Sequence, residues 1–317
     1  MTKASCTTCS GERVLISGAS GLIGDRVRAA LKGDGHEVVA LVRRPVAPGQ
    51  REIHWDPDSH VVDGSALEGF DVVIHLAGEN IAGGRWTPER KRAILRSRMD
   101  GTSLLSRSLA GVSHRPRVLI SASAVGYYGH RDDEVVDEDS SPGKGFLAEV
   151  ARQWEAATEP AREAGIRVVN LRIGMVLSVG GGALAKMLRP FRAGLGGVAG
   201  KGWQYVSWIA LDDLVAVVRF VLAKDGLYGP INAVAPHPVT NREFVTTLGK
   251  VLHRPAVVPM PALAVRLMFG EMGQALLLEG ARVIPKRLLD AGFTFGFGDL
   301  EAALRNELEK SASSDAH

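Results

Sequence analysis

Cysteine is almost missing from this chain of 317 residues, which has only Cys6 and Cys9. A Cys-x-x-Cys pair can carry a redox disulfide or supply half of a zinc site, but the sequence has no second pair to complete such a site. Both cysteines also lie in a polar segment ahead of the first apolar run. We therefore predict no metal site, and we interpret residues 1–12 as a disordered tail.

Long apolar runs and an excess of one charge are also lacking. No stretch approaches the roughly 20 apolar residues that span a bilayer, and the N-terminus has no apolar signal-peptide core. The 38 Lys and Arg residues are balanced by 35 Asp and Glu residues, which leaves a formal net charge of +3. These features favour a cytoplasmic protein with neither a membrane nor a nucleic-acid partner.

Glycine, in contrast, is abundant at 37 residues, and three glycines near the N-terminus follow one another at intervals of three. The apolar run Val14–Ile16 predicts a buried strand, and Gly18, Gly21 and Gly24 then lead into a predicted helix. A second predicted strand, Glu37–Val42, completes a βαβ unit. In this context a glycine-rich turn is typical of a dinucleotide site, because the backbone can approach a pyrophosphate and the helix N–H groups point at the anion.

The end of the second predicted strand indicates which dinucleotide is bound. An NAD site usually has Asp or Glu there, which accepts hydrogen bonds from the ribose 2′-hydroxyl. This chain continues instead with Val42, Arg43 and Arg44, and two guanidinium groups suit a 2′-phosphate. A solvated basic turn is the alternative, but we predict NADP(H) as the cofactor. The predicted contacts from the turn and this strand end are Gly18, Ser20, Gly21, Leu22, Ile23, Gly24, Val42, Arg43 and Arg44.

Predicted strands and helices alternate through the first half of the chain, which is typical of a parallel, doubly wound sheet. After Val176, glycine-rich turns and shorter helices follow. We predict an α/β protein with a Rossmann-type doubly wound parallel sheet and a smaller, mostly helical C-terminal domain on the substrate side. The predicted organisation is an NADP-binding Rossmann domain at 13–176, a substrate-side region at 177–308 in which 205–235 return to the sheet and 254–308 are helical, and a tail at 309–317.

Short motifs along most of the chain resemble those of one family. They include Gly18-Ala-Ser-Gly-Leu-Ile-Gly24, Leu76-Ala-Gly-Glu-Asn-Ile81, Ser121-Ala-Ser-Ala-Val-Gly-Tyr-Tyr-Gly129, Gly180-Gly-Gly-Ala183 and Val283-Ile-Pro-Lys-Arg287. The chain resembles the extended short-chain dehydrogenase/reductase superfamily, of the nucleotide-sugar epimerase and dehydratase type. More narrowly, it resembles the group called "epimerase family protein". The resemblance runs over residues 13–308, and its C-terminal part is similar to a domain of unknown function that this group carries.

The resemblance implies further cofactor contacts at the ends of other strands. Leu76, Ala77 and Gly78 match a strand end that passes beside the adenosine and ribose, and Arg98 matches a contact from the following helix. A solvent-facing helix residue is the alternative for Arg98. The segment that begins at Ile173 should border the nicotinamide. The cofactor contacts implied in this way are Leu76, Ala77, Gly78, Arg98, Ser121, Ile173, Gly174 and Val176.

The catalytic residues of the superfamily are only partly matched. In that superfamily a tyrosine exchanges the proton, a lysine four residues later lowers the pKa of the tyrosine, and a serine or threonine orients the substrate oxygen. Ser123 is the candidate serine, although it can equally cap a turn. Phe146 and Val150 occupy the positions of the Tyr-x-x-x-Lys pair, so the usual proton donor is missing.

Tyr127 and Tyr128 are the candidate replacements for the missing tyrosine, provided that a cation such as Lys144 or Lys186 lies nearby. Simple packing of a turn is the alternative for both tyrosines. His75 lies within an apolar strand, and we interpret it as a core histidine. Trp203, Trp208 and Phe191 either line a substrate cavity or belong to the core.

Two functions remain open at this point. The first is an NADP(H)-dependent oxidoreductase or epimerase that acts on a small carbonyl, hydroxyl or nucleotide-sugar-like compound. The second is a non-catalytic NADP(H)-binding sensor or interaction protein. Members of the superfamily are commonly homodimers paired through helices that flank the sheet, which here would be 88–109 and 146–164, but the pattern of these helices leaves the oligomeric state open.

Overall fold

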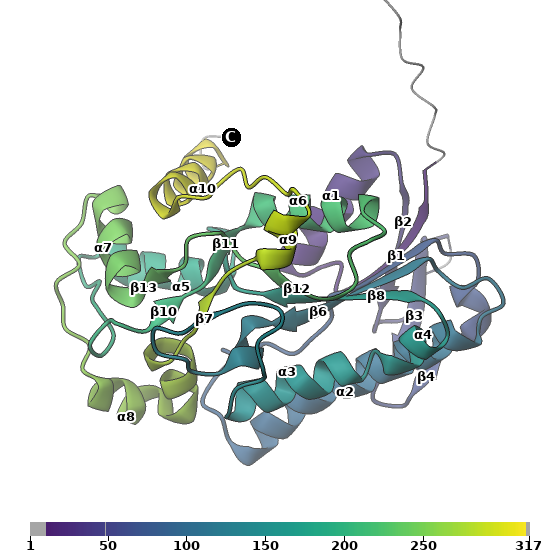
Figure 1. The fold of residues 1–317 in the computed structure, drawn as a ribbon, viewed down its shortest axis with the longest axis horizontal. Coiled ribbons are helices and arrows are strands. Elements are labelled where there is room, and N and C mark those ends of the chain that lie inside the picture. The colour runs from purple at the N-terminus through teal and green to yellow at the C-terminus, as the bar shows by residue number, and fades with distance from the viewer. Residues whose placement is uncertain (1–10, 48, 315–317) are drawn as a thin grey trace, which may run out of the picture.

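The computed structural model describes residues 11–47 and 49–314, and its centre is an eight-stranded sheet (Figure 1). The strand order is β12-β8-β6-β5-β1-β2-β3-β4, and every neighbouring pair is parallel except β3 with β4. These strands are β1 (Arg13–Ser17), β2 (Glu37–Val42), β3 (Glu52–Asp56), β4 (Val61–Val62), β5 (Val72–His75), β6 (Val118–Ala124), β8 (Arg167–Ile173) and β12 (Gly229–Ala233). The order reverses between β1 and β5, and a doubly wound sheet binds its ligand at the carboxyl ends of the strands beside such a reversal. The predicted α/β fold with a Rossmann-type sheet is confirmed.

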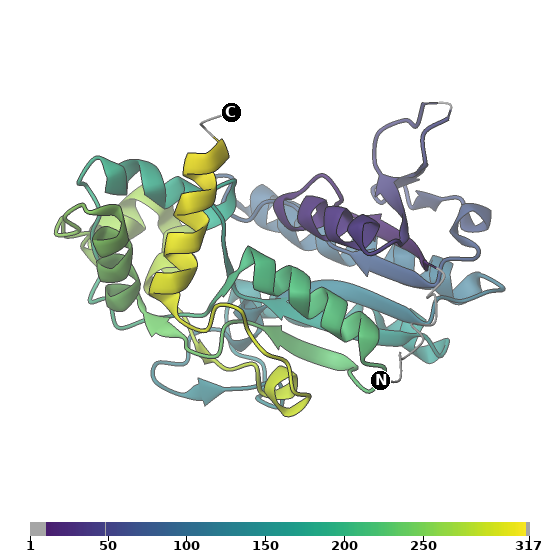
Figure 2. The ribbon, with the colours of Figure 1, turned by 90° about the horizontal axis from the view of Figure 1, so that it is seen from above.

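Helices cover both faces of the sheet, because successive side chains of each central strand point to opposite sides. Val14 and Ile16 belong to an apolar cluster with α1 (Leu22–Gly33) and α6 (Leu211–Ala223). Leu15, between them, belongs to a second cluster with α2 (Pro88–Gly111) on the opposite face. Figure 1 shows the two layers, with α1 and α6 above the sheet and α2 below it, and in Figure 2, seen from above, α1 and α6 lie in front of the sheet.

The helix expected over 146–164 is in fact two helices. α3 (Phe146–Ala156) ends ahead of a short turn, and α4 (Glu159–Glu163) follows. Pro160 lies in the first turn of α4 and has no N–H to continue the ladder of α3. The hydroxyl of Thr158 donates to the Glu155 carbonyl at 2.6 Å, which satisfies one of the last acceptors of α3. The break therefore has a local cause in the sequence.

The C-terminal half of the chain contributes both to the sheet and to a separate apolar cluster. Within residues 205–235, α6 covers the sheet and β12 joins its edge, whereas β10 and β11 pair outside the eight-stranded sheet. A third cluster joins α5 (Gly182–Arg192), α7 (Asn241–Leu252) and α10 (Leu300–Ser314). The remaining short elements are η1 (Gly64–Leu67), η2 (Val125–Tyr128), β7 (Val135–Val136), β9 (Met175–Leu177), β10 (Tyr205–Val206), β11 (Trp208–Ala210), β13 (Val239–Thr240), α8 (Ala262–Gly273), η3 (Gln274–Leu278), β14 (Arg282–Val283) and α9 (Lys286–Asp290).

The two chain ends differ from the predicted boundaries. α10 runs to Ser314, so residues 309–314 are helical rather than part of a tail. Within the predicted tail 1–12, Glu12 accepts two hydrogen bonds from Arg117 at 2.6 and 3.0 Å, whereas Cys6 and Cys9 lie outside the described residues. In the part of the chain that the structure describes, no helix is both long and apolar enough to cross a bilayer.

Candidate functional site

The glycine-rich turn lies at the carboxyl end of β1, next to the reversal of strand order. Gly18 has a φ of +70°, and a Cβ at this position would lie 2.8 Å from the backbone of Leu76 and Ala77 on the neighbouring strand. A Cβ on Gly24 would lie 2.1 Å from the Gly18 carbonyl oxygen. These two glycines therefore allow the turn to close tightly against β5 and against the start of α1.

The same turn leaves backbone donors available for an anion. α1 begins after Gly21, and no side chain caps its first turn. The N–H groups of a first turn have no partner within the helix, so an anion can accept hydrogen bonds from them. A Cβ on Gly21 would approach only the Gly18 carbonyl, at 3.3 Å, which leaves the outer side of the turn open. Ser20 is exposed there, and Leu22 and Ile23 are half-buried. The turn thus fits the pyrophosphate of a dinucleotide.

The two arginines after β2 have different surroundings. Arg44 donates two hydrogen bonds to the Glu52 carboxylate, at 2.8 and 2.6 Å, and is thereby tied to β3. Arg43 is exposed and makes no hydrogen bond or ion pair with any residue that the structure describes. Of the two, Arg43 is therefore the guanidinium that is free to meet a 2′-phosphate, while Val42 is half-buried at the end of the strand.

The carboxyl end of β5 is held in place by hydrogen bonds to buried polar side chains. The N–H groups of Leu76 and Ala77 donate to the Ser17 hydroxyl at 3.2 and 3.3 Å. The His75 ring bridges Ser17, at 2.6 Å, and Thr102, at 3.0 Å. Burial lowers the pKa of His75 to about 4, so the ring is neutral at physiological pH. The interpretation of His75 as a core histidine is confirmed, and its role is to fix the strand end on which Leu76 and Ala77 lie.

Arg98, on α2, lies directly behind Gly78. A Cβ on Gly78 would lie 3.4 Å from the Arg98 guanidinium carbon, and the guanidinium donates to the Glu79 carbonyl at 3.0 Å. The ring of Trp154 covers its other side at 4.9 Å. Burial lowers the pKa of Arg98 to about 10, which still leaves it charged at neutral pH. The alternative of a solvent-facing Arg98 is wrong, because this cation lies beside the strand end.

Further along the sheet edge, the ends of β6 and β8 differ in accessibility. Ile173, Gly174 and Val176 are partly exposed, and their contact with a nicotinamide stays a prediction. Ser121 is fully buried within β6 and has no exposed surface for a cofactor. The prediction of a cofactor contact through the Ser121 side chain is therefore corrected, since this side chain is fully buried.

A buried polar network lies at the carboxyl ends of β6, β8 and β12. Ser123 donates to the Glu155 carboxylate at 2.7 Å, and Arg172 donates two hydrogen bonds to the same carboxylate, at 2.8 and 2.9 Å. Arg172 also donates to the Tyr128 hydroxyl at 2.8 Å, and that hydroxyl donates to the Asn232 side-chain oxygen at 2.8 Å. Burial raises the pKa of Tyr128 to about 12.

This network changes the assignment of the candidate catalytic residues. Ser123 and Tyr128 are buried, and both hydroxyls are engaged inside the protein. Neither side chain can meet a substrate without a rearrangement of the network, so the prediction of direct contact is corrected for both. Tyr127 is half-buried, and its ring centroid lies 3.5 Å from the Arg172 guanidinium carbon. It is the candidate tyrosine that retains exposed surface.

The cation beside the tyrosines is neither of the predicted lysines. Lys186 donates from its ammonium group to the Ala82 carbonyl at 2.9 Å, and Lys144 is exposed on its loop. Arg172 and Glu155 belong to the candidate site but were not predicted from the sequence. The available signal was Arg172 itself, a charged residue between the apolar Leu171 and Ile173 near the carboxyl end of a predicted strand.

The positions of the usual Tyr-x-x-x-Lys pair belong to an apolar cluster. The Phe146 ring meets Trp86 edge to face at 5.1 Å, and Val150 is buried next to Ile94. Proton exchange at either position is excluded, because neither side chain has a dissociable proton. In addition, the described residues contain no group of three or more His, Cys, Asp or Glu placed to hold a metal ion.

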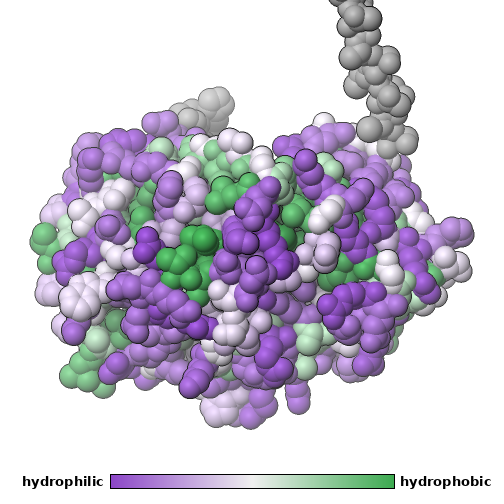
Figure 3. Space-filling model, in the orientation of Figure 1, coloured by the Kyte–Doolittle hydropathy of each residue, from purple (hydrophilic) through white to green (hydrophobic). Residues whose placement is uncertain are grey.

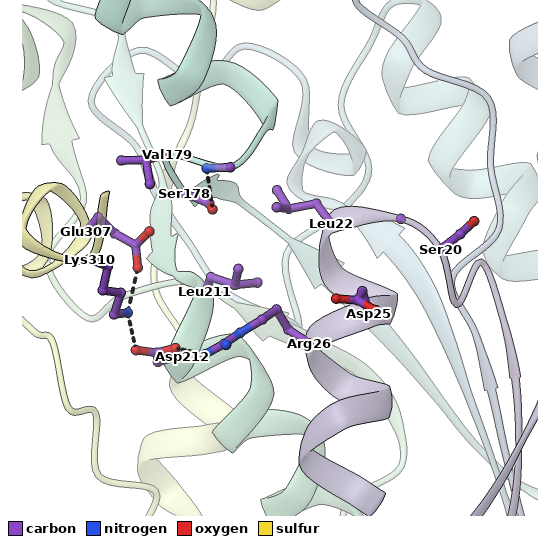
Figure 4. A pocket seen from close by; sticks show the side chains of 12 residues that line it. Ser20, Leu22, Asp25, Arg26, Ser178, Val179, Leu211, Asp212, Glu307 and Lys310 are labelled. Atoms are coloured by element: carbon purple, nitrogen blue, oxygen red, sulfur yellow. Dashed lines mark hydrogen bonds and ion pairs between the residues drawn. The ribbon is translucent and has the colours of Figure 1, made fainter. Parts of the chain in front are cut away.

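A cavity of about 470 Å³ adjoins the glycine-rich turn (Figure 4). Arg26 on α1 and Lys310 on α10 both pair with Asp212 at the start of α6, and Lys310 also pairs with Glu307 at 2.8 Å. The turn itself contributes Ser20, Gly21 and Leu22 to the lining. The C-terminal helix therefore comes close to the place where the cofactor's phosphates fit.

The sheet, the turn and the polar strand ends define a dinucleotide-binding protein with the Rossmann fold of the extended short-chain dehydrogenases/reductases. A family model described as "NAD dependent epimerase/dehydratase family" matches residues 14–233, and a domain of unknown function, DUF1731, matches residues 260–307. The chain belongs to this NAD-dependent epimerase/dehydratase family.

Named relatives cover almost the whole chain. "Epimerase family protein Mb2239" of Mycobacterium bovis is 46% identical over 92% of this chain and 96% of its own length. "Epimerase family protein SDR39U1" of Mus musculus is 41% identical over 93% of this chain and 99% of its own length. Among solved structures, human SDR39U1 with NADPH has a TM-score of 0.85 at 36% identity and covers 94% of this chain and 99% of its own. A nucleoside-diphosphate sugar epimerase from Corynebacterium glutamicum has a TM-score of 0.78 at 36% identity, over 97% of this chain and 62% of its own.

Proposed function

We propose that this protein binds NADP(H) in preference to NAD(H). The observation that carries the proposal is the free, exposed Arg43 directly after β2, at a strand end where the sequence has two arginines in place of the Asp or Glu that holds a ribose 2′-hydroxyl. The open turn at Gly21 would hold the pyrophosphate, and the ends of β5 and β8 would border the rest of the cofactor. The NADPH bound to human SDR39U1, a structural relative, supports this assignment.

Fluorescence titration of the purified protein with NADPH and NADH tests the cofactor proposal. We expect tight binding of NADPH, much weaker binding of NADH, and a loss of this preference in Arg43→Ala. Arg44→Ala is the matched control, because Arg44 is held by Glu52 and its removal should change the preference little. Equal affinities for the two cofactors in the unaltered protein would contradict the proposal.

We further propose an oxidoreductase or epimerase reaction on a small carbonyl, hydroxyl or nucleotide-sugar-like compound. When bound, the nicotinamide would supply or accept the hydride. Tyr127 would exchange the proton at its phenol oxygen, since it is the candidate tyrosine with exposed surface. Arg172 would position the Tyr127 ring by stacking against it, while the Glu155 carboxylate fixes the guanidinium.

A screen of carbonyl compounds by NADPH oxidation tests the proposed reaction. Tyr127→Phe should retain NADPH binding and lose turnover of any compound that the screen identifies. Tyr228→Phe is the control, because Tyr228 is exposed away from these strand ends and its removal should leave turnover unchanged. Full turnover in Tyr127→Phe would remove the assignment of the tyrosine.

The second candidate function is a non-catalytic NADP(H)-binding sensor or interaction protein. The apolar surroundings of Phe146 and Val150 and the engaged hydroxyls of Ser123 and Tyr128 favour it. This function predicts tight NADPH binding without turnover across the whole panel. Reproducible oxidation of NADPH by one defined metabolite would eliminate it.

A further inference from the structure

One end of the molecule concentrates exposed apolar side chains. In the part of the chain that the structure describes, seven large apolar side chains are exposed by 63% or more. Six of the seven lie within residues 195–203 and 257–268, namely Leu195, Trp203, Val257, Leu263, Leu267 and Met268. We call this group the apolar end. In Figure 3 hydrophobic surface is visible at the lower left, where Figure 1 places α8.

The two segments form one continuous surface, although they are far apart in the sequence. The N–H of Val258 donates to the Gly196 carbonyl at 3.0 Å, and the N–H of Met260 donates to the Val198 carbonyl at 3.2 Å. The N–H of Gly200 returns a bond to the Met260 carbonyl at 2.9 Å. These hydrogen bonds hold residues 196–200, which follow α5, beside residues 258–260, which precede α8.

The charge around the apolar end is mostly positive, and the carboxylate of Glu271 on α8 is paired with Lys91 at 2.7 Å. Residues 189–203 and 254–270 contain Arg189, Arg192, Lys201, Arg254 and Arg266 and no Asp or Glu. None of these five cations forms an ion pair with a carboxylate among the described residues; Arg254 and Arg266, for example, donate to a backbone carbonyl and to an amide oxygen. These two segments therefore carry a local charge of +5, against a net charge of +3 for the whole chain.

We propose that the apolar end docks this protein onto a lipid bilayer with anionic headgroups. Its apolar side chains protrude, which suits insertion between lipid headgroups better than burial in a rigid protein partner. The uncompensated cations would meet the lipid phosphates. A second copy of the chain is a poorer occupant, because a two-fold contact would bring the same unpaired cations together.

Trp203 and Lys201 support a lipid partner over an acidic protein. The Trp203 ring is 67% exposed, and the Lys201 ammonium lies 5.2 Å from its centroid. An aromatic ring with a cation at its side is suited to the boundary between acyl chains and headgroups. Docking of this kind needs no spanning helix, which is why the apolar runs of the sequence gave no sign of it.

Co-sedimentation with vesicles tests the proposal. We expect binding to phosphatidylcholine vesicles that contain phosphatidylglycerol, little binding to phosphatidylcholine alone, and loss of binding as salt is raised. The variant Leu263→Ser/Leu267→Ser/Met268→Ser should lose binding. The control variant Val61→Ser/Val135→Ser removes exposed apolar side chains elsewhere and should bind as the unaltered protein does.

Tryptophan fluorescence provides a second readout that does not depend on the folding of the triple variant. Trp203 is exposed, whereas Trp55, Trp86, Trp154 and Trp208 are buried. Anionic vesicles should therefore shift the emission to the blue, and Trp203→Phe should lack the shift.

Three outcomes would overturn the proposal. The first is no binding to anionic vesicles, and the second is equal binding to both vesicle types. The third is a concentration-dependent dimer, or a complex with polyglutamate, that forms through the same residues while vesicles are not bound. Because vesicle binding is measured without cofactor, failure here is independent of the proposed NADP(H) function.

Discussion

At the scale of single residues, the ion pair of Arg172 with Glu155 is notable because both charged side chains are largely buried. The exposed fractions of the two side chains are 3% and 13%, and both oxygens of the carboxylate accept from the guanidinium. A buried pair of this kind adds little net stability compared with apolar residues, but removal of one partner leaves an uncompensated charge. The pair therefore fixes the geometry around Tyr127 more than it stabilises the fold.

The first prediction concerns this pair. Arg172→Met should lower the free energy of unfolding by about 3–5 kcal/mol, because it leaves the Glu155 carboxylate buried and unpaired. Urea denaturation followed by circular dichroism measures the loss. Arg152→Met is the matched control, since Arg152 pairs with Glu149 on the exposed face of α3, the helix that also carries Glu155. This substitution should lower the free energy of unfolding by less than about 1 kcal/mol. Equal losses in the two variants would show that the Arg172 pair is effectively solvated.

The second prediction concerns the buried histidine. His75 has a pKa of about 4 in the folded protein against 6.5 for the free group, so the unfolded chain binds more protons between these two values. Stability should therefore be fully present above about pH 6.5 and fall by about 3 kcal/mol as the pH decreases to 4. Denaturation curves at several pH values measure this slope.

Two further measurements separate His75 from other titrating groups. The NMR signals of its ring should not titrate over the pH range in which an exposed histidine does. His75→Gln should reduce the slope, whereas His114→Gln should leave it unchanged, since the His114 side chain is 87% exposed. A normal titration of His75 in the folded protein would contradict the assignment.

At the scale of elements, the sequence predicted best what depends on local pattern. The apolar run of β1 and the three glycines after it were sufficient to predict the strand, the turn and the start of α1. The prediction of a single helix over 146–164 was wrong, because Pro160 interrupts the backbone hydrogen bonds that the apolar periodicity would otherwise favour. The ends of β5 and β8 were indicated by the resemblance to the short-chain dehydrogenase/reductase superfamily rather than by a local pattern.

Side-chain partners from distant elements could not be predicted in the same way. Ser123 and Tyr128 are near each other in the sequence, but the residues that engage their hydroxyls come from α3, β8 and β12. Whether a hydroxyl at a strand end faces a cleft or a buried partner depends on those distant side chains. For this reason the position of the candidate site could be predicted from the sequence, whereas the accessibility of its candidate catalytic residues could not.

The third prediction compares two glycines of the same turn. Gly24→Ala places a Cβ 2.1 Å from the Gly18 carbonyl oxygen and should lower stability by about 3 kcal/mol or more, because backbone must move. Gly21→Ala has more room, at 3.3 Å, and should retain the fold while weakening NADPH binding. Thermal denaturation and NADPH titration of both variants measure these effects. A stable Gly24→Ala protein with normal affinity would rule out the tight turn described above.

At the scale of the whole molecule, the C-terminal helix reaches back to the first turn of the chain. Lys310 on α10 and Arg26 on α1 pair with the same carboxylate, Asp212, on one wall of the cavity beside the turn (Figure 4). Residues almost 300 positions apart in the sequence thus determine the charge near the proposed pyrophosphate site.

The fourth prediction follows from this contact. Lys310→Ala leaves Asp212 and Glu307 less compensated beside the turn, so the affinity for NADPH should fall by about fivefold at low salt and recover as salt screens the charge. Fluorescence titration at two salt concentrations measures the change. Lys250→Ala is the control, because it removes an ion pair between α7 and α10 away from the cavity. Identical losses in the two variants would indicate a general loosening of α10 instead.

The position of β12 at the edge of the sheet also has a consequence for the order in which the chain folds. Residues 229–233 pair with β8, and α6 ahead of them covers one face of β1. A chain that ends at residue 176 would expose the apolar edge of β8 and one face of the sheet, and such edges promote aggregation. During synthesis the Rossmann sheet therefore cannot be completed before residue 233 has left the ribosome, and until then the edge of β8 stays open to aggregation.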